Sequence, residues 1–288
     1  DGSSVWLASL AKLLAKDKDN IVDILLKEKI TNDILVRDLL CLKNVSLLNS
    51  DNYIYSQKSV DNSNVVKIMK RIDDMRDYSC IIVRGFETVS TIVRDRQLAD
   101  KLIPYLTNFC HDKNKITKEE VNELTYIYNN TKQFFTQTKQ MKKYLEDVMN
   151  VDGDKFKILN PMIFMDDIKV NDKFKKSIVY AGKIASGWNI IELLEIMDRL
   201  YQKDKDITLH FIGDKFNRDM ASKKEEILNK LNTMPNVVFY GSLPKDETTS
   251  IINSCELGYS FRSSNVDNDE SLELSSKILE YCFCGVPL

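Results

Sequence analysis

The loop GKIASGWN, residues 182–189, combines residue types that can bind an anion. Gly182 allows a ligand to approach the backbone closely, and the helix expected after the loop offers unsatisfied N–H groups at its amino end. Lys183 adds a positive charge at the same place, where negative charge on a departing group would build up.

A charged pair near the carboxyl end of the sequence raises a second question. Lys277 and Glu280 lie one helical turn apart in SSKILEYCFCGVPL, residues 275–288, which is otherwise mostly apolar. One interpretation is an ordinary ion pair on a helix surface, which contributes only about 0.3–0.5 kcal/mol. The other interpretation is a pair of polar groups that bind a ligand.

The second half of the chain alternates between segments typical of strands and of helices, with glycine, proline and polar residues between them. The expected strands are residues 177–181, 207–213, 236–241 and 256–261, and the expected helices are residues 188–202, 222–231, a segment opened by Pro244 and Asp246, and residues 275–283. Four such units in a row favour a parallel sheet covered by helices on both faces.

The first half shows the same alternation at less regular lengths. Its expected helices are residues 4–16, 116–129 and 139–150, and its expected strands are residues 20–26, 78–85, 101–109 and 133–138. Asn160-Pro161 begins a polar stretch without periodicity. We therefore expect an N-terminal α/β domain at residues 1–160, a linker at residues 161–176 and a C-terminal domain at residues 177–288.

Composition and charge argue against several classes of protein. The formal net charge of −2 gives no overall attraction to nucleic acid, so nucleic acid is not an expected partner. No apolar run approaches the roughly 18 residues of a membrane span, and the first residues lack the pattern of a signal peptide, so we expect a cytoplasmic protein. Six scattered cysteines without a CxxC pair, and only two histidines, argue against a metal site and favour buried free thiols.

Four segments of the second half match, in order and spacing, the motifs of one family. They are VYAGKI (179–184), LHFIGDKF (209–216), NVVFYGSLPKDE (236–247) and SSKILEYCFCGVPL (275–288). Together they resemble the C-terminal nucleotide-sugar domain of retaining GT-B glycosyltransferases, of the group 1 or family 4-like type. The resemblance covers the second half well and the first half loosely. It implies an α/β fold of two Rossmann-like domains that face a cleft.

The resemblance also implies roles for the residues of the carboxyl-terminal helix. Glu280 stands where the family's glutamate binds the ribose hydroxyls of the donor nucleotide. Ser276 and Lys277 lie where the diphosphate of the donor would bind, although Lys277 could also be a solvated helix lysine. Many relatives carry a second glutamate at the position of Leu272, and here Glu273 or Glu270 would have to supply that carboxylate.

A further departure from the family's pattern lies in the loop at residues 182–189, after the first expected strand of the C-terminal domain. Gly182 and Lys183 match the family's glycine and basic residue, with Lys183 stabilising the departing diphosphate. The family places a second basic residue a few positions later, where this sequence has Ser186. Arg262, expected at the end of another strand, would replace that charge, or else is an ordinary surface arginine.

The first half holds candidates that the resemblance places less firmly. Gly2, Ser3 and Ser4 resemble the family's glycine-containing loop, which would face the cleft and the donor phosphate or the acceptor. The alternative is a serine that caps the first helix, and both roles can hold at once. The strand expected before this loop is absent, and the chain stops where the family begins another strand, so we expect a fragment trimmed at both ends.

Two further candidates follow expected strands of the first half. His111 and Arg84 are candidate catalytic residues that would bind the transferring sugar or the acceptor, with a loop histidine of no catalytic role as the alternative for His111. His210 alternates within a strand and is expected to be structural.

The function that the resemblance implies is metal-independent transfer of a hexose from a nucleoside-diphosphate sugar to an acceptor hydroxyl, with retention and without a cofactor. A bacterial role in surface polysaccharide or glycoconjugate synthesis would follow, with a saccharide, lipid-linked or protein acceptor. KQMKKYL, residues 139–145, would then contact the inner face of a membrane or form a solvated helix face. The alternatives are a non-catalytic partner of an active glycosyltransferase and a nucleotide-sugar epimerase.

Overall fold

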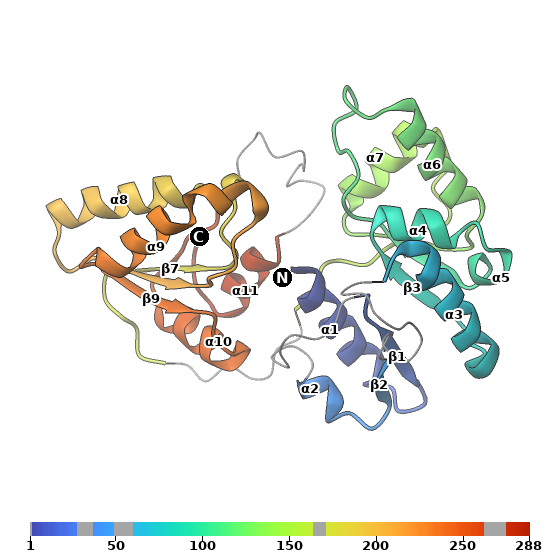
Figure 1. Cartoon of the computed structure of the whole chain (residues 1–288), viewed down its shortest axis with the longest axis horizontal. Helices are drawn as coiled ribbons and strands as arrows, with labels where there is room; N and C mark the ends of the chain where they lie inside the picture. Colours follow the sequence, from blue (N-terminus) through green and yellow to red (C-terminus); the bar gives the residue numbers. More distant parts are fainter. Residues whose placement is uncertain (1, 28–36, 49–59, 164–170, 262–274) are drawn as a thin grey trace.

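The computed structural model describes residues 2–27, 37–48, 60–163, 171–261 and 275–288. Within these residues every pair of strands is parallel, which confirms the expected α/β class (Figure 1). The strands form three sheets, in the orders β1 (Val22–Leu25)–β2 (Val45–Leu48), β3 (Ile81–Arg84)–β4 (Leu102–Tyr105)–β5 (Phe134–Thr136)–β6 (Phe156–Ile158), and β10 (Leu257–Gly258)–β7 (Ser177–Ala181)–β8 (Thr208–Ile212)–β9 (Val237–Gly241).

The helices of the first half pack around its two sheets. They are α1 (Gly2–Leu14), α2 (Arg37–Leu40), α3 (Asn62–Arg76), α4 (Phe86–Ile92), α5 (Arg96–Ala99), α6 (Lys118–Asn129) and α7 (Lys139–Met149). Helices α1 and α2 cover the two-stranded sheet. Asp61, Thr117 and Thr138 each accept a hydrogen bond from a backbone N–H three residues later, which fixes the starts of α3, α6 and α7. The apolar side chains of these three helices share one core with the four-stranded sheet.

The second sheet is buried on both faces, as the alternation along β7 shows. Val179 and Ala181 lie in one core with Tyr281, whereas Tyr180 lies in the opposite core with Leu194. The first of these cores is covered by α10 (Lys245–Ser254) and α11 (Ser276–Phe283), and the second by α8 (Ile190–Lys203) and α9 (Lys224–Thr233). This is the two-sided cover that the strand and helix pattern predicts, although only Leu257–Gly258 of the strand expected at 256–261 pairs with β7.

The second part of the expected linker is hydrogen-bonded to the end of α10. The Asn171 backbone N–H donates to Asn253 Oδ1 at 2.9 Å, and the Phe174 N–H donates to the Ser254 carbonyl at 2.7 Å. Lys173 Nζ donates to the carbonyl oxygen of Cys255 at 3.1 Å. Residues 171–174 are therefore attached to the second sheet, while the domain boundaries themselves stay a prediction.

Helix α1 contacts both halves of the chain. Trp6 and Leu10 share a small core with Tyr105 of β4, which attaches α1 to the first sheet. At its amino end α1 lies next to α11 of the second half, where the chain terminus is drawn in Figure 1. This contact brings the start of the chain close to the helix that carries Lys277 and Glu280.

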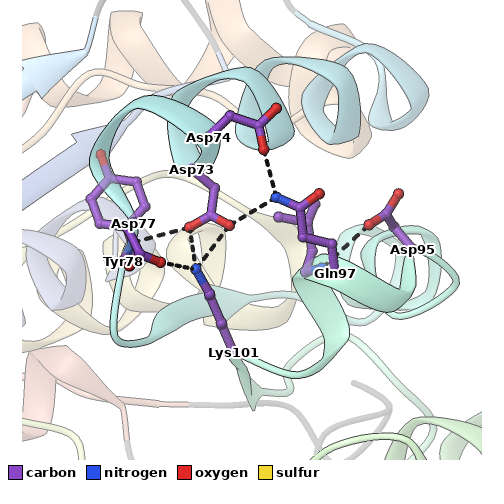
Figure 2. Close-up of polar contacts among 8 residues, drawn as sticks. Asp73, Asp74, Asp77, Tyr78, Asp95, Gln97 and Lys101 are labelled. Atoms are coloured by element: carbon purple, nitrogen blue, oxygen red, sulfur yellow. Dashed lines mark hydrogen bonds and ion pairs between the residues drawn. The ribbon is translucent and has the colours of Figure 1, made fainter.

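A polar network ties α3 to the segment before β4, as Figure 2 shows. Asp73, which is 2% exposed, accepts hydrogen bonds from Lys101 Nζ at 2.9 and 3.0 Å, from the Tyr78 N–H at 3.0 Å and from Gln97 Nε2 at 3.1 Å. Lys101 also pairs with Asp77 at 2.8 Å. Burial alone would raise the pKa of Asp73, but the hydrogen bonds from Lys101, Gln97 and Tyr78 outweigh it and lower that pKa.

Two further expectations concern the surface. All six cysteines are free, as expected, but the expected burial is wrong for Cys41, Cys80 and Cys282, which are exposed because they lie at or near the ends of elements rather than under them. Among the described helices, none is both long enough and apolar enough to cross a bilayer.

Candidate functional site

The order of the strands in the second sheet marks one edge as a binding crevice. The chain passes from β7 outward to β8 and β9, and then returns to pair β10 with the other side of β7. In open parallel sheets, ligands bind at the carboxyl ends of the strands where the chain reverses in this way. The relevant crevice is therefore at the carboxyl ends of β7 and β10, from which the loop after β7 and α11 extend.

Glycine at the carboxyl ends of neighbouring strands leaves this edge without side chains. Gly182 follows β7 and Gly213 follows β8, and a Cβ atom on Gly213 would lie 2.1 Å from the carbonyl oxygen of Gly182. Gly213 also has a φ of 120°, which favours glycine. Gly241 ends β9 and accepts a hydrogen bond from the Gly213 N–H at 2.7 Å. The three glycines allow the backbones to pack together and expose main chain at the crevice.

Lys277, in the first turn of α11, points its ammonium group at this edge. Its side chain lies against Gly182, since a Cβ atom on that glycine would be 3.1 Å from Lys277 Cε and 3.4 Å from Nζ. Nζ lies 4.0 Å from the ring centroid of Tyr180 and 4.5 Å from that of Trp188. The residue is 7% exposed, and its buried Nζ has no hydrogen-bond partner among the described residues. A buried polar group without a partner is uncommon in native proteins, which makes Lys277 a candidate for ligand binding.

The electrostatic setting of Lys277 follows from this burial. Burial is the main cause that lowers the pKa of Lys277 to about 7; the negative charge of Glu280 opposes this shift and the positive charge of Lys183 adds to it. The surface ion pair and the solvated lysine are therefore wrong as interpretations of Lys277, because its amine is buried and has no hydrogen-bond partner within the described ranges.

Glu280 lies one turn further along α11 and is partly buried. Burial raises the pKa of Glu280 above its usual value, against the attraction of Lys245 and Lys277. The next residue, Tyr281, fixes this helix to the sheet, because its hydroxyl accepts a hydrogen bond from the Ala181 N–H at 2.9 Å. Lys277 and Glu280 are thus held at the end of β7 by a buried contact of their own helix.

The loop after β7 folds as a short 3-10 helix, η2 (Ser186–Trp188), before α8 begins at Ile190. Lys183 is exposed at the start of the loop, and its carbonyl oxygen accepts a hydrogen bond from the Tyr180 hydroxyl. Ser186, which stands at the expected second basic position, donates from its backbone and its hydroxyl to Asp219 Oδ2 at 3.0 and 2.5 Å. These hydrogen bonds lower the pKa of Asp219, so a carboxylate is held where the family pattern has a positive charge.

Of the other expected site residues of the second half, the structure describes Ser276 but not Arg262 or Glu273. Ser276 is the first residue of α11, next to Lys277, and the N-cap residue Ser275 makes no side-chain hydrogen bond to the helix. Arg262 and Glu273, as well as Glu270 and Leu272, lie outside the described residues.

The glycine-containing loop expected at the start of the chain is instead the first turn of α1. Gly2 and Ser3 already lie in this helix, because it begins two residues earlier than its apolar spacing predicts. Ser4 is therefore inside the helix, and its interpretation as an N-cap is wrong. The contact of α1 with α11 brings this turn near the candidate site.

Arg84 is the last residue of β3 and His111 lies in the loop after β4, and the ring contacts of both are with residues of the first half. The guanidinium carbon of Arg84 lies 5.3 Å from the centroid of the Trp6 ring and 5.8 Å from that of Tyr105. His111 is 6% exposed and packs edge-on against Phe109, with ring centroids 4.6 Å apart. Both positions are at the carboxyl side of the first sheet.

The structure supports the expectation for His210 and adds residues that the sequence did not indicate. His210 Nδ1 lies 2.8 Å from the Tyr240 hydroxyl, and burial lowers the pKa of this histidine, as suits a structural residue. Tyr180 and Trp188, which flank Lys277, were missed. The only available signal was that each lies within a few residues of the Gly182–Lys183 pair. Among the described residues, no group of His, Cys, Asp and Glu side chains could hold a metal ion.

Comparisons with known proteins identify the fold. No protein-family model matches the chain, and no curated protein matches it significantly. Anabaena HepE, solved with UDP and glucose, is similar at a TM-score of 0.65 and 12% identity over 100% of this chain and 76% of its own. WaaG, a glycosyltransferase involved in lipopolysaccharide biosynthesis, is similar at 0.63 and 11% identity over 98% of this chain and 75% of its own.

A third similar structure is a mutant of S. aureus TarM in complex with fondaparinux, α-GlcNAc-glycerol and UDP. It has a TM-score of 0.55 and 12% identity over 80% of this chain, which spans only 44% of TarM. The identities are low, so these likenesses concern the fold and not the substrate. In its parallel sheets, their connecting helices and their order, the chain has the GT-B fold of glycosyltransferases.

Proposed function

We propose that this chain binds a nucleoside-diphosphate sugar at the carboxyl edge of the second sheet and transfers the sugar to an acceptor hydroxyl. The observation that carries the proposal is the ammonium group of Lys277, which is buried at this edge and has no hydrogen-bond partner in the part of the chain that the structure describes. An anionic ligand would supply the missing acceptors, and a diphosphate has the oxygen atoms to do so. The structures of HepE and TarM with UDP support a nucleotide as that ligand.

Different residues at this edge would bind different parts of the donor. Lys277 and Lys183 would balance the charge that builds on the diphosphate as the sugar leaves, together with the first turn of α11 at Ser276. Glu280, one turn further on, would accept hydrogen bonds from the ribose hydroxyls, as a carboxylate has two oxygens for two neighbouring donors. Gly182 leaves room for the ligand to approach the main chain.

The acceptor would bind on the side of the first sheet, toward which Arg84 and His111 extend. We propose retention of the anomeric configuration and metal-independent chemistry, in which the two lysines balance the charge of the leaving diphosphate. Closure of the donor side against the acceptor side would exclude water from the site. This would favour transfer, because hydrolysis of the donor competes with it. A saccharide, lipid-linked or protein acceptor, and contact of the basic face of α7 with a membrane, belong to the same proposal.

Ligand binding tests this proposal directly. The chain is screened by thermal shift against UDP, GDP, ADP, CMP and their sugar derivatives, together with the Glu280→Ala variant and the control Glu195→Ala, which lies on the exposed side of α8. A ligand at a hundred times its dissociation constant adds about 2.7 kcal/mol of stability. We expect one nucleotide to stabilise the wild type and the control but not Glu280→Ala.

Product analysis separates the alternatives. With donor and a candidate acceptor, a transferase forms a glycoside and releases the nucleoside diphosphate, whereas an epimerase changes the donor without any acceptor. If no nucleotide in the panel stabilises the wild type, the non-catalytic partner replaces the transferase as the better explanation. That Ser186 and Asp219 occupy a position where a positive charge is expected is the observation that favours this second candidate.

A further inference from the structure

The two aromatic rings beside Lys277 occupy the place that a carboxylate fills in an ordinary buried ion pair. Tyr180 comes from β7 and Trp188 from η2, and their ring centroids lie 4.0 and 4.5 Å from Nζ. The faces of aromatic rings attract a cation, most strongly where water is excluded. The rings therefore hold the lysine without using any of its three N–H donors.

Few charged groups face the Lys277 amine. On its own helix Glu280 attracts the ammonium form, and in the loop after β7 Lys183 repels it. The hydroxyl of Tyr180 donates to the Lys183 carbonyl and so is engaged elsewhere, while the Trp188 ring carries no titratable group. Among the described residues, one carboxylate and two ring faces support the amine, and its burial lowers the pKa of Lys277 to about 7.

We propose that Tyr180 and Trp188 are positioning residues for Lys277, and that binding of a diphosphate at this edge draws one proton from solvent onto its amine. The inference rests on the proposed donor site. With the site empty, the amine is partly unprotonated because no acceptor stabilises its charge. The phosphate oxygens then supply acceptors and negative charge, the amine takes up a proton, and the resulting ammonium donates to them. Binding of the nucleotide consequently weakens as the pH rises above 7.

Calorimetry measures the proton directly. UDP, GDP and ADP are each titrated into the full chain at pH 8 in buffers of different ionisation enthalpy, and the slope of the observed enthalpy gives the number of protons taken up. We expect close to one proton for wild type, because an amine with a pKa of about 7 is mostly neutral at pH 8. Lys277→Arg should bind without taking up this proton, because a guanidinium group is always charged.

The aromatic rings are tested by the pH dependence of affinity. Trp188→Leu should weaken nucleotide binding roughly 10-fold at pH 8 and much less at pH 6, where the wild-type amine is already protonated. Trp188→Phe, which keeps a ring, should stay within about 3-fold of wild type. The matched control is Tyr201→Leu, since Tyr201 makes a similar contact with Lys205 at 3.9 Å on the solvated side of α8. A purely structural Trp188 would weaken binding by the same factor at both pH values.

A second measurement does not depend on a ligand. In ¹⁵N-lysine NMR spectra of the full chain, one Nζ resonance should titrate near pH 7 and be missing in Lys277→Arg. If every lysine titrates near 10.5, the inference is overturned. It is also overturned, with the proposed function intact, if a nucleotide binds equally well from pH 6 to pH 8 without uptake of a proton. If none of the three nucleotides binds at any pH, the proposed function and this inference fall together.

Discussion

Two lysines of this chain lie in opposite environments. Lys101, before β4 of the first sheet, donates to Asp73 and Asp77, and these hydrogen bonds raise its pKa above the usual value (Figure 2). Lys277, at the carboxyl edge of the second sheet, lies beside two aromatic rings and has no acceptor among the described side chains and backbone groups, and burial lowers its pKa. A lysine thus completes a hydrogen-bond network at Lys101, whereas the donors of Lys277 are available for a ligand.

The difference separates a polar group that stabilises the fold from one that is available to bind a ligand. Around Asp73 all acceptors are used by groups of the chain itself, so the network adds to stability and has nothing left for a ligand. At Lys277 the donors are unused, which costs stability until a ligand arrives.

Asp73→Ala should lower the free energy of unfolding by about 3 kcal/mol, because it leaves the N–H of Tyr78 without its acceptor and removes from Lys101 the buried one of its two acceptors. Urea unfolding measures the change. Asp77→Asn is the control, since the Asp77 side chain is 95% exposed and asparagine tolerates its left-handed backbone at a φ of 48°. Equal losses for both variants would show that burial of Asp73 is not what makes the network stabilising.

Lys277→Met should have the reverse profile. We expect the affinity for the nucleotide to fall roughly 100-fold, equivalent to about 2.7 kcal/mol, while the free energy of unfolding stays the same or rises by about 1 kcal/mol. Methionine keeps the length of the side chain and removes the buried charge. Calorimetry and urea unfolding of the same preparation check the two expectations. A large loss of stability would mean that Lys277 is a structural group like Lys101.

The two lysines should also give the stability of the empty protein opposite dependences on pH. Lys277 has a folded pKa of about 7, below the 10.5 of a free lysine, so between these values the unfolded chain binds more protons and stability rises with pH. The slope is at most about 1.4 kcal/mol per pH unit. Lys101 has a raised pKa, so its contribution is complete below 10.5 and is lost as the pH rises through the folded value.

Unfolding curves of wild type and Lys277→Met between pH 6.5 and 9 isolate the first of these slopes. The free energy of unfolding of wild type should rise steadily relative to that of Lys277→Met over this range if the amine titrates as described. A constant difference would place the pKa of Lys277 near that of an ordinary lysine.

Gly182→Ala is the mildest change. Its Cβ would lie 3.1 Å from Lys277 Cε, close enough to displace the end of a flexible side chain but not the backbone. We expect a loss of about 3-fold to 10-fold in nucleotide affinity, and a loss of about 1 kcal/mol in stability because residues with a side chain rarely adopt the φ of 157° found here. In the Lys277→Met background the same substitution should have little further effect on affinity, and a double-mutant cycle measures this coupling. Additive losses would mean that the alanine blocks the ligand and not the lysine.

The sequence indicated the second sheet better than the first. β7 begins and ends where its apolar run predicts, and β8 and β9 do so within one residue, because glycine and polar residues follow each run. In the first half β2 and β6 were missed, since runs of four and three residues are too short to show a period. α3 was also missed, although Asp61 caps it.

The candidate site was indicated in part. Order and spacing of motifs placed Gly182, Lys183, Lys277 and Glu280 at one edge of a sheet, and the described structure brings the loop after β7 and the first turn of α11 together there. Tyr180 and Trp188 flank the lysine because α11 packs on β7 through Tyr281. No local pattern predicts this contact, since α11 and β7 are far apart in the sequence. Likewise no local pattern pairs Asp73 with Lys101, which come together only when α3 packs beside β4.

The glycines at the ends of β7, β8 and β9 have a consequence for how this protein can change over time. A position that already lacks a side chain can only gain atoms by substitution, and at Gly213 any gain collides with the neighbouring strand. Variation is thereby confined to the loops that follow, where residues can be exchanged without disturbing the platform. For protein engineering, the strand ends can therefore be kept constant while the loops that follow them are changed to alter ligand preference.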